Sequence, residues 1–468
     1  LHWGRVGDGA DKLTLNKKIS HRTEISIMEH AAGKNGQHQI GLFPASNIVI
    51  ANMVGAGIFT TSGLLMSGLG NPWFLIILWV TGGIIALCGA LSYAELGAAM
   101  PQAGGEYIFL SRLYSPLFGF LSGWVSFVAG FSAPIAASAI GFSEYLFRAF
   151  PELAGIGKIG LFPGAHLDKI LAVAVILIFT FIHLRGLKFG SKIQNWLTIM
   201  KVLLIAVLIV AGLSFGKGDF AHFAQGSPAN FNFSTIKTIS LSLMWIMFAY
   251  SGWNASTYIG SEIKNPERNI PRSLLYGTGI VVILYVLLNL VFVYATPPEE
   301  MKGVISIGGL TVKNLFGSSM EFVFSLLIAF ALFSSLSAFI IIGPRVYYSM
   351  ARDGYFFKFA AKVHPRYQVP SAAIIMQAAI AIIMVLSGTF DQILTYMGFS
   401  LGIFPIMAVA GVFKLRAEGK NKRIMKGFPV HLVLYLFFGV TILFLSYLER
   451  PVESSIALAT ALAGIPFF

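Results

Sequence analysis

Two short segments place small residues and polar groups inside long apolar runs. They are Asn52-Met53-Val54-Gly55-Ala56-Gly57-Ile58 and Phe248-Ala249-Tyr250-Ser251-Gly252-Trp253-Asn254. Glycine allows the backbone to leave the helical conformation. In lipid, an amide or carbonyl without a helical partner is tolerated only where it lines a cavity or contacts a ligand. We therefore predict that both helices are interrupted and that the interruptions face a binding site.

The backbone groups at the two predicted interruptions are suited to a zwitterion. Amides that begin a helix, here those of Ala56, Gly57 and Ile58, favour a carboxylate because the positive end of the helix dipole lies behind them. Carbonyls that end the preceding half-helices favour an ammonium, and Trp253 and Asn254 complete the candidate site. The candidate carbonyls belong to Met53, Val54, Phe248, Ala249 and Ser251. The alternative is that Gly55-Ala56-Gly57 forms a small-residue helix contact, which is common in membranes.

Lys201 is a charged residue deep in another apolar run, between Trp196 and Leu204. A charge at such a depth costs at least ~2.5 kcal/mol on insertion scales, so it requires a reason. We predict that the ammonium replaces a coupling cation between the first and eighth spans. There it either fixes the first helix or carries a proton. The alternative, in which Lys201 snorkels to the headgroups, requires a long reach.

No catalytic constellation is visible in the sequence. A P-loop and a dinucleotide fingerprint are absent, the histidines are scattered, and Cys88 is the single cysteine. We therefore expect no enzyme activity, no cofactor and no metal site. A cationic or polyamine substrate is disfavoured because no intramembrane carboxylate near the predicted site would neutralise it.

The elements that must position these residues follow from composition. Hydrophobic residues make up 56% of the 468 residues, charged residues make up 11%, and the mean hydropathy is +0.76. Because each bilayer crossing needs about 20 apolar residues, we predict an all-α membrane protein with about twelve transmembrane helices. Asp391 is expected to cap the tenth. The predicted spans are 42–66, 72–100, 113–147, 168–183, 190–214, 237–260, 272–296, 320–350, 371–388, 391–413, 429–448 and 452–467.

The net charge of +13 is distributed unevenly between the loops. If the N-terminus is inside, the cytoplasmic segments contain about three times as many Lys and Arg residues as the external segments, which is the usual topology signal. We therefore predict that both termini are cytoplasmic and that nucleic acid is not a partner. Residues 1–40 are polar and lack the apolar region of a secretory signal, so we expect a disordered cytoplasmic tail.

Several motifs together resemble the amino acid-polyamine-organocation (APC) superfamily, and specifically its L-type amino acid transporter branch. Beyond the two interrupted segments, they include Tyr93-Ala94-Glu95-Leu96, the PQAGGEY sequence from Pro101 to Tyr107, and the run from Asn265 to Arg272. The motifs occur in the family's order and the resemblance covers nearly everything from about residue 40 onward.

The resemblance implies a LeuT-like fold with five-plus-five inverted repeats, in which helices 1 and 6 are discontinuous. It further implies that Lys201 is the family lysine of the fifth helix and that Phe248 closes over the substrate. External cysteines that link animal relatives to a heavy chain have no counterpart here, so we expect a stand-alone prokaryotic protein with no disulfide-linked heavy chain. The implied domains are a tail at 1–40, a first repeat at 41–214, a second repeat at 237–414, and two final helices at 428–468.

These observations predict a secondary transporter of L-amino acids in the plasma membrane, with the lipid bilayer and an amino acid as its partners. Sodium-independent exchange of neutral amino acids, as in an antiporter, is the expected mode, with Lys201 in place of a sodium ion. A proton-coupled symporter, in which Lys201 titrates, is the nearest alternative. A non-transporting amino-acid sensor is an alternative of another class, although neither tail is long enough to form a signalling domain.

Overall fold

Helices build the described part of the chain, as the composition predicts. The computed structural model describes residues 40–468 except 103, 154–166, 186, 227–231, 368 and 420–426. The predicted tail at 1–40 therefore lies outside the described residues apart from Ile40. The first helices are α2 (Leu42–Met53), α3 (Ala56–Leu69), α4 (Pro72–Ala99), α5 (Glu106–Leu113), α6 (Pro116–Val125), the π-helix η1 (Ser126–Gly130), α7 (Ser132–Ala149), α9 (Leu167–Leu184) and α10 (Leu187–Phe215).

The remaining helices follow the same chain order, and several short ones connect the long ones. They are η2 (Phe220–Ala224), α11 (Phe233–Ala249), η3 (Ala255–Glu262), α12 (Pro266–Ala295), α13 (Pro298–Met301), α14 (Ile307–Phe316), α15 (Ser318–Arg352), η4 (Lys358–Ala361), α16 (Ser371–Ser387), α17 (Phe390–Ala417), α18 (Val430–Glu449), α19 (Pro451–Leu462) and η5 (Ile465–Phe467).

Membrane crossing is supported by the length and hydropathy of these helices. Within the described ranges, nine helical stretches are long and apolar enough to cross a bilayer. Three shorter apolar helices, Phe233–Ala249, Ser371–Ser387 and Pro451–Phe467, occupy the places of the sixth, ninth and twelfth predicted spans. The all-helical membrane fold is thus confirmed. The sixth span is short as a helix because its chain leaves the α-helical path after Ala249.

The peripheral helices leave apolar surface that requires lipid. Only 28% of the most apolar window of α9 and 28% of that of α18 are buried inside the protein, whereas 89% of that of the first span is buried. Burying apolar surface is the main favourable contribution to folding, so the uncovered faces of α9 and α18 are suited to the hydrocarbon of a bilayer. The first span lies instead in the interior.

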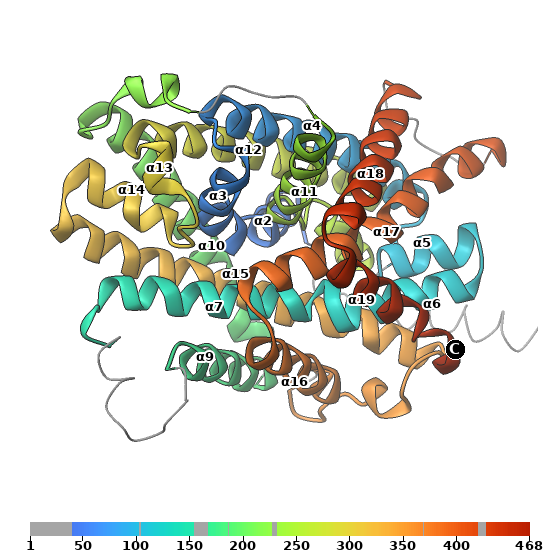
Figure 1. Ribbon diagram of the computed structural model, residues 1–468. Helices are drawn as coiled ribbons and strands as arrows, with labels where there is room; N and C mark the ends of the chain where they lie inside the picture. Colours follow the sequence, from blue (N-terminus) through green and yellow to red (C-terminus); the bar gives the residue numbers. More distant parts are fainter. Residues whose placement is uncertain are drawn as a thin grey trace, which may run out of the picture. The chain divides into compact units, whose positions relative to one another are not determined.

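Long helices pack side by side around this interior span. Figure 1 shows α7 running along α15, with α9 and α16 together on one side of that pair. The helix α2 contacts α12 and α15, and α3 contacts α11. These contacts pack the first span against three helices of the second predicted repeat, which is what the candidate site requires.

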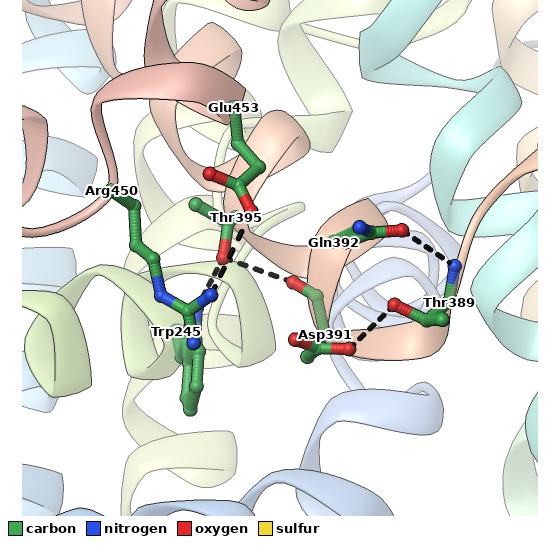
Figure 2. A network of polar contacts seen from close by, with 7 residues as sticks. All are labelled: Trp245, Thr389, Asp391, Gln392, Thr395, Arg450 and Glu453. Atoms are coloured by element: carbon green, nitrogen blue, oxygen red, sulfur yellow. Dashed lines mark hydrogen bonds and ion pairs between the residues drawn. The ribbon is translucent and has the colours of Figure 1, made fainter.

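The start of α17 corrects one expectation. The N-cap is Thr389 rather than Asp391, and Thr389 forms a capping box with Gln392. Asp391 lies in the first turn, where Oδ1 accepts a hydrogen bond of 2.6 Å from the Thr389 hydroxyl. Figure 2 shows how the same turn anchors α11, because Trp245 Nε1 donates to Thr395 Oγ1 at 3.1 Å. The anchor fixes α11 a few residues before its interruption.

Candidate functional site

Both predicted interruptions are present, and they lie against each other. The first span breaks at Val54 and Gly55, whose backbones are extended between α2 and α3. The sixth span breaks after Ala249 and continues as the 3-10 helix η3. Gly252 in this break has φ of +96°, a conformation that favours glycine, and a Cβ there would lie 2.7 Å from Cβ of Asn52. The prediction that helices 1 and 6 are discontinuous is confirmed.

Gly57 lies where the two broken helices approach each other closely. A Cβ built on Gly57 would lie 2.6 Å from Cα of Ala249 and 3.3 Å from Cε1 of Phe248. The small-residue contact that was the alternative interpretation of this segment is therefore real at Gly57. It coexists with the break, because the contact holds the start of α3 against the end of α11.

Tyr285 of α12 connects the two breaks through its hydroxyl. The hydroxyl oxygen lies 2.6 Å from the carbonyl oxygen of Met53 and 3.2 Å from that of Ala249. The ring is fully buried and packs edge-on against Trp79 at a centroid distance of 5.5 Å. One side chain thus supplies a hydrogen-bond donor where both helices end, a function that no sequence motif indicated.

Replacing Tyr285 with phenylalanine should weaken the affinity for substrate about tenfold without reducing membrane insertion. The change leaves the packing of the ring but removes a donor to two carbonyls, and a buried hydrogen bond contributes about 0.5–1.5 kcal/mol. Substrate affinity of the purified variant measures the effect. The matched control is Tyr294→Phe, whose hydroxyl makes a long contact of 3.5 Å with the Gly216 carbonyl and should tolerate the loss. Equal affinity for both variants would contradict the connecting role.

Lys201 of α10 lies beside the first break, between α2 and α15. Its Nζ donates to the carbonyl of Ala51 at 2.7 Å and to that of Val54, and lies 3.4 Å from Ser335 Oγ. The side chain is only 1% exposed, so it does not snorkel to the surface. An ammonium has three donors and no acceptor, and here three oxygens surround it. The carbonyl of Val54 also accepts a hydrogen bond of 2.9 Å from Ser335 Oγ, so this oxygen has two donors, Lys201 and Ser335.

A cavity of about 100 Å³ adjoins the second break. Four predicted site residues, Phe248, Ser251, Trp253 and Asn254, line it. The structure places the other predicted residues at the helix junction rather than in the cavity wall. Those residues are Met53, Val54, Gly55, Ala56, Gly57, Ile58, Ala249 and Lys201.

The cavity also has wall residues that the sequence reasoning missed. They include Asn52 of α2, Phe131 between η1 and α7, Tyr258 of η3 and Glu106 of α5. The signal for Glu106 was available, because it belongs to the PQAGGEY motif. From the sequence, no intramembrane carboxylate was expected near the site. Glu106 begins α5, between the second and third predicted spans, and the fold brings this short helix into the cavity wall.

Residues 40–465 match the family described as amino acid permease. The chain belongs to the amino acid permease family. This membership covers nearly the whole chain, and it confirms the resemblance of the motifs to the APC superfamily and its L-type branch.

Named relatives of this amino acid permease include animal and bacterial proteins. The mouse large neutral amino acids transporter small subunit 2 is 27% identical over 449 residues, which are 94% of this chain and 82% of that protein. The serine/threonine exchanger SteT of Bacillus subtilis (strain 168) is 28% identical over 449 residues, 94% of this chain and 98% of that protein. The mouse b(0,+)-type amino acid transporter 1 is 28% identical over 416 residues, 87% and 80% of the two chains.

Proposed function

We propose that this amino acid permease is a secondary transporter that exchanges neutral L-amino acids by alternating access and without sodium. The observation that carries the proposal is the meeting of two interrupted helices beside a cavity that Phe248, Ser251, Trp253 and Asn254 line. Interrupted helices that meet in this way form the central binding site of many secondary transporters. The names of the relatives, a neutral amino acid transporter and a serine/threonine exchanger among them, support the same substrate class.

The substrate's carboxylate is assigned to the start of α3. Its first-turn amides belong to Ala56, Gly57 and Ile58, and in the described structure no side chain caps this turn. Uncapped amides at a helix start provide donors and a favourable dipole for an anion. The ammonium is assigned to the carbonyls of the second break. The carbonyls of the first break are already engaged, because that of Val54 accepts from Lys201 and Ser335 and that of Met53 accepts from Tyr285.

The absence of a sodium requirement is assigned to Lys201. Its ammonium lies among two carbonyl oxygens and a hydroxyl, which are the oxygen ligands that a small hard cation would use. A fixed positive charge in this place stabilises the end of α2 permanently, whereas a bound ion would do so only while it remains. We assign Lys201 to this structural role, and proton transfer by Lys201 is the alternative that the experiments below separate.

The location of the chain follows from the same proposal. Both termini are placed in the cytoplasm because the basic residues gather in the loops of one side, and the membrane is proposed to be the plasma membrane. The external cysteine through which animal relatives join a heavy chain has no counterpart in this sequence, so the transporter is proposed to act without a disulfide-linked subunit. The single cysteine, Cys88, is buried in α4.

If Lys201 takes the place of a sodium ion, the rate of transport should be the same in sodium buffer and in choline buffer. Proteoliposomes loaded with unlabelled L-serine or L-leucine would take up the labelled amino acid at the same rate in either buffer, and the D-enantiomers would compete weakly. A rate that falls severalfold in choline would contradict the role of Lys201. Saturable binding of amino acid without flux in any buffer would instead favour the alternative that the protein is a non-transporting amino-acid sensor.

A further inference from the structure

Glu106 is a buried carboxylate with neutral hydrogen-bond donors around it. It begins α5, is 5% exposed and lines the cavity. Its Oε1 accepts from the Tyr93 hydroxyl at 2.7 Å and from Asn254 Nδ2 at 2.8 Å. Tyr258, whose hydroxyl accepts from Asn254 at 3.2 Å, also hydrogen-bonds the carboxylate. The donors belong to α4, to the second break and to η3, so Glu106 joins three segments at the cavity.

No cation balances this carboxylate in the described part of the chain. Around α5, Arg416 pairs with Glu95 at 2.6 Å and Lys414 donates to the Leu113 carbonyl. On its own helix, Arg112 donates to Gln102 at 3.0 Å. A buried charge without a partner is costly, so the group favours a bound proton. On α15, Arg345 pairs with Glu262 of η3 at 3.4 Å. Further ionisable groups on neighbouring elements include Tyr93 and Glu95 on α4, Tyr258 on η3, Tyr347 and Asp353 at α15, Lys414 and Arg416 on α17, and His431 and Tyr435 on α18.

We propose that Glu106 is a proton-binding site of the transport cycle, occupied when η3 and the second break close on α4 and α5, and that it makes exchange depend on pH. The proposal rests on the proposed function, since it concerns the cavity of that transporter. Closure takes up one proton from water onto the carboxylate, and opening returns it. The proton is bound at Glu106 and not at Lys201, whose donors all face acceptors.

The sign of the pH dependence follows from burial. Burial raises the pKa of Glu106 from its ordinary value of 4.5 to about 7, against a smaller lowering by the three hydrogen bonds. In an open conformation that hydrates the carboxylate, the pKa returns towards 4.5. Below pH 4.5 Glu106 is protonated in both conformations, and above pH 7 it is protonated in neither. The equilibrium between the two conformations therefore depends on pH between these values. Within it, raising the pH disfavours closure by up to about tenfold per pH unit.

The test is equilibrium exchange in proteoliposomes with the same pH on both sides, from pH 4.5 to 8. The wild-type rate should change several-fold along one titration curve with its midpoint between pH 4.5 and 7. Glu106→Gln, which resembles the protonated acid, should keep one rate throughout. The matched control is Glu299→Gln, because Glu299 is 78% exposed and pairs with Lys302, its neighbour three residues on; this variant should retain the wild-type curve.

A second variant keeps the test decisive if Glu106→Gln does not fold. Tyr93→Phe removes a donor that stabilises the carboxylate, so the midpoint should move to higher pH. A purely structural contact would lower the rate without moving the midpoint. The proposal is overturned if Glu106→Gln keeps the wild-type pH curve, or if Tyr93→Phe leaves the midpoint in place. A third result would also overturn the proposal: the wild type takes up lysine, and Glu106→Gln abolishes this uptake but keeps the wild-type pH curve. The carboxylate would then pair with a substrate side chain. Absence of wild-type flux at every pH would instead count against the proposed function.

Discussion

Replacing Lys201 with methionine should lower the exchange rate at least about thirtyfold. Methionine fills much of the same volume, but the carbonyls of Ala51 and Val54 lose the donor that they face. The Ala51 carbonyl then faces no ammonium, and the Val54 carbonyl keeps only the Ser335 hydroxyl. A buried acceptor left without a donor costs about 1–3 kcal/mol, which is enough to displace the end of α2. The measurement is exchange of a labelled neutral amino acid, normalised to the amount of protein inserted into the vesicles.

The control for this variant is Lys217→Met, because Lys217 follows α10 and lies exposed at its end. That variant loses the same charge but no buried contact, so it should exchange at the wild-type rate. Exchange by Lys201→Met at more than half the wild-type rate would show that the ammonium is not needed to hold the first break.

Replacing Gly57 with alanine should abolish detectable substrate binding while the protein still inserts into the membrane. The new Cβ would lie 2.6 Å from Cα of Ala249, which is a backbone atom and cannot rotate away. The start of α3 and the end of α11 must therefore separate, and the two breaks no longer meet. Larger residues, such as valine, should have the same effect. Binding of a labelled amino acid to the purified variant measures it.

Gly279→Ala is the matched control for Gly57→Ala. Gly279 also lies within a long helix, α12, but a Cβ there meets nothing within 4 Å. The control should bind substrate with wild-type affinity. Normal affinity in Gly57→Ala would remove the first helix from the binding site.

Local patterns predicted the interruptions because their cause is local. Glycine lowers the cost of a non-helical backbone wherever it occurs, and apolar runs with Gly55 and Gly252 inside them are visible without knowledge of the fold. The depth of Lys201 in its span was visible for the same reason. The carbonyls of Ala51 and Val54 were not predicted as partners of Lys201, because the packing of α10 against α2 sets these contacts.

Tertiary contacts decide the parts of the site that the sequence did not indicate. Tyr285 resembles any other aromatic residue of an apolar helix until the fold brings its hydroxyl to Met53 and Ala249. Glu106 lies outside every predicted span, so a search for intramembrane carboxylates passed over it. The cap of α17 was misassigned to Asp391 because acidic residues are common both at N-caps and in first turns, and the boundary of the helix at Thr389 separates the two.

The central claim is exchange, and its most direct measurement compares loaded with empty proteoliposomes. Labelled neutral L-amino acid is supplied outside in sodium-free buffer, with unlabelled amino acid inside or with none, and an imposed proton gradient is added to a parallel set of empty vesicles. The account predicts strong stimulation by internal substrate and little accumulation in empty vesicles with or without the gradient. Gradient-driven accumulation into empty vesicles, with no stimulation by internal substrate, would contradict exchange and establish a proton-coupled symporter.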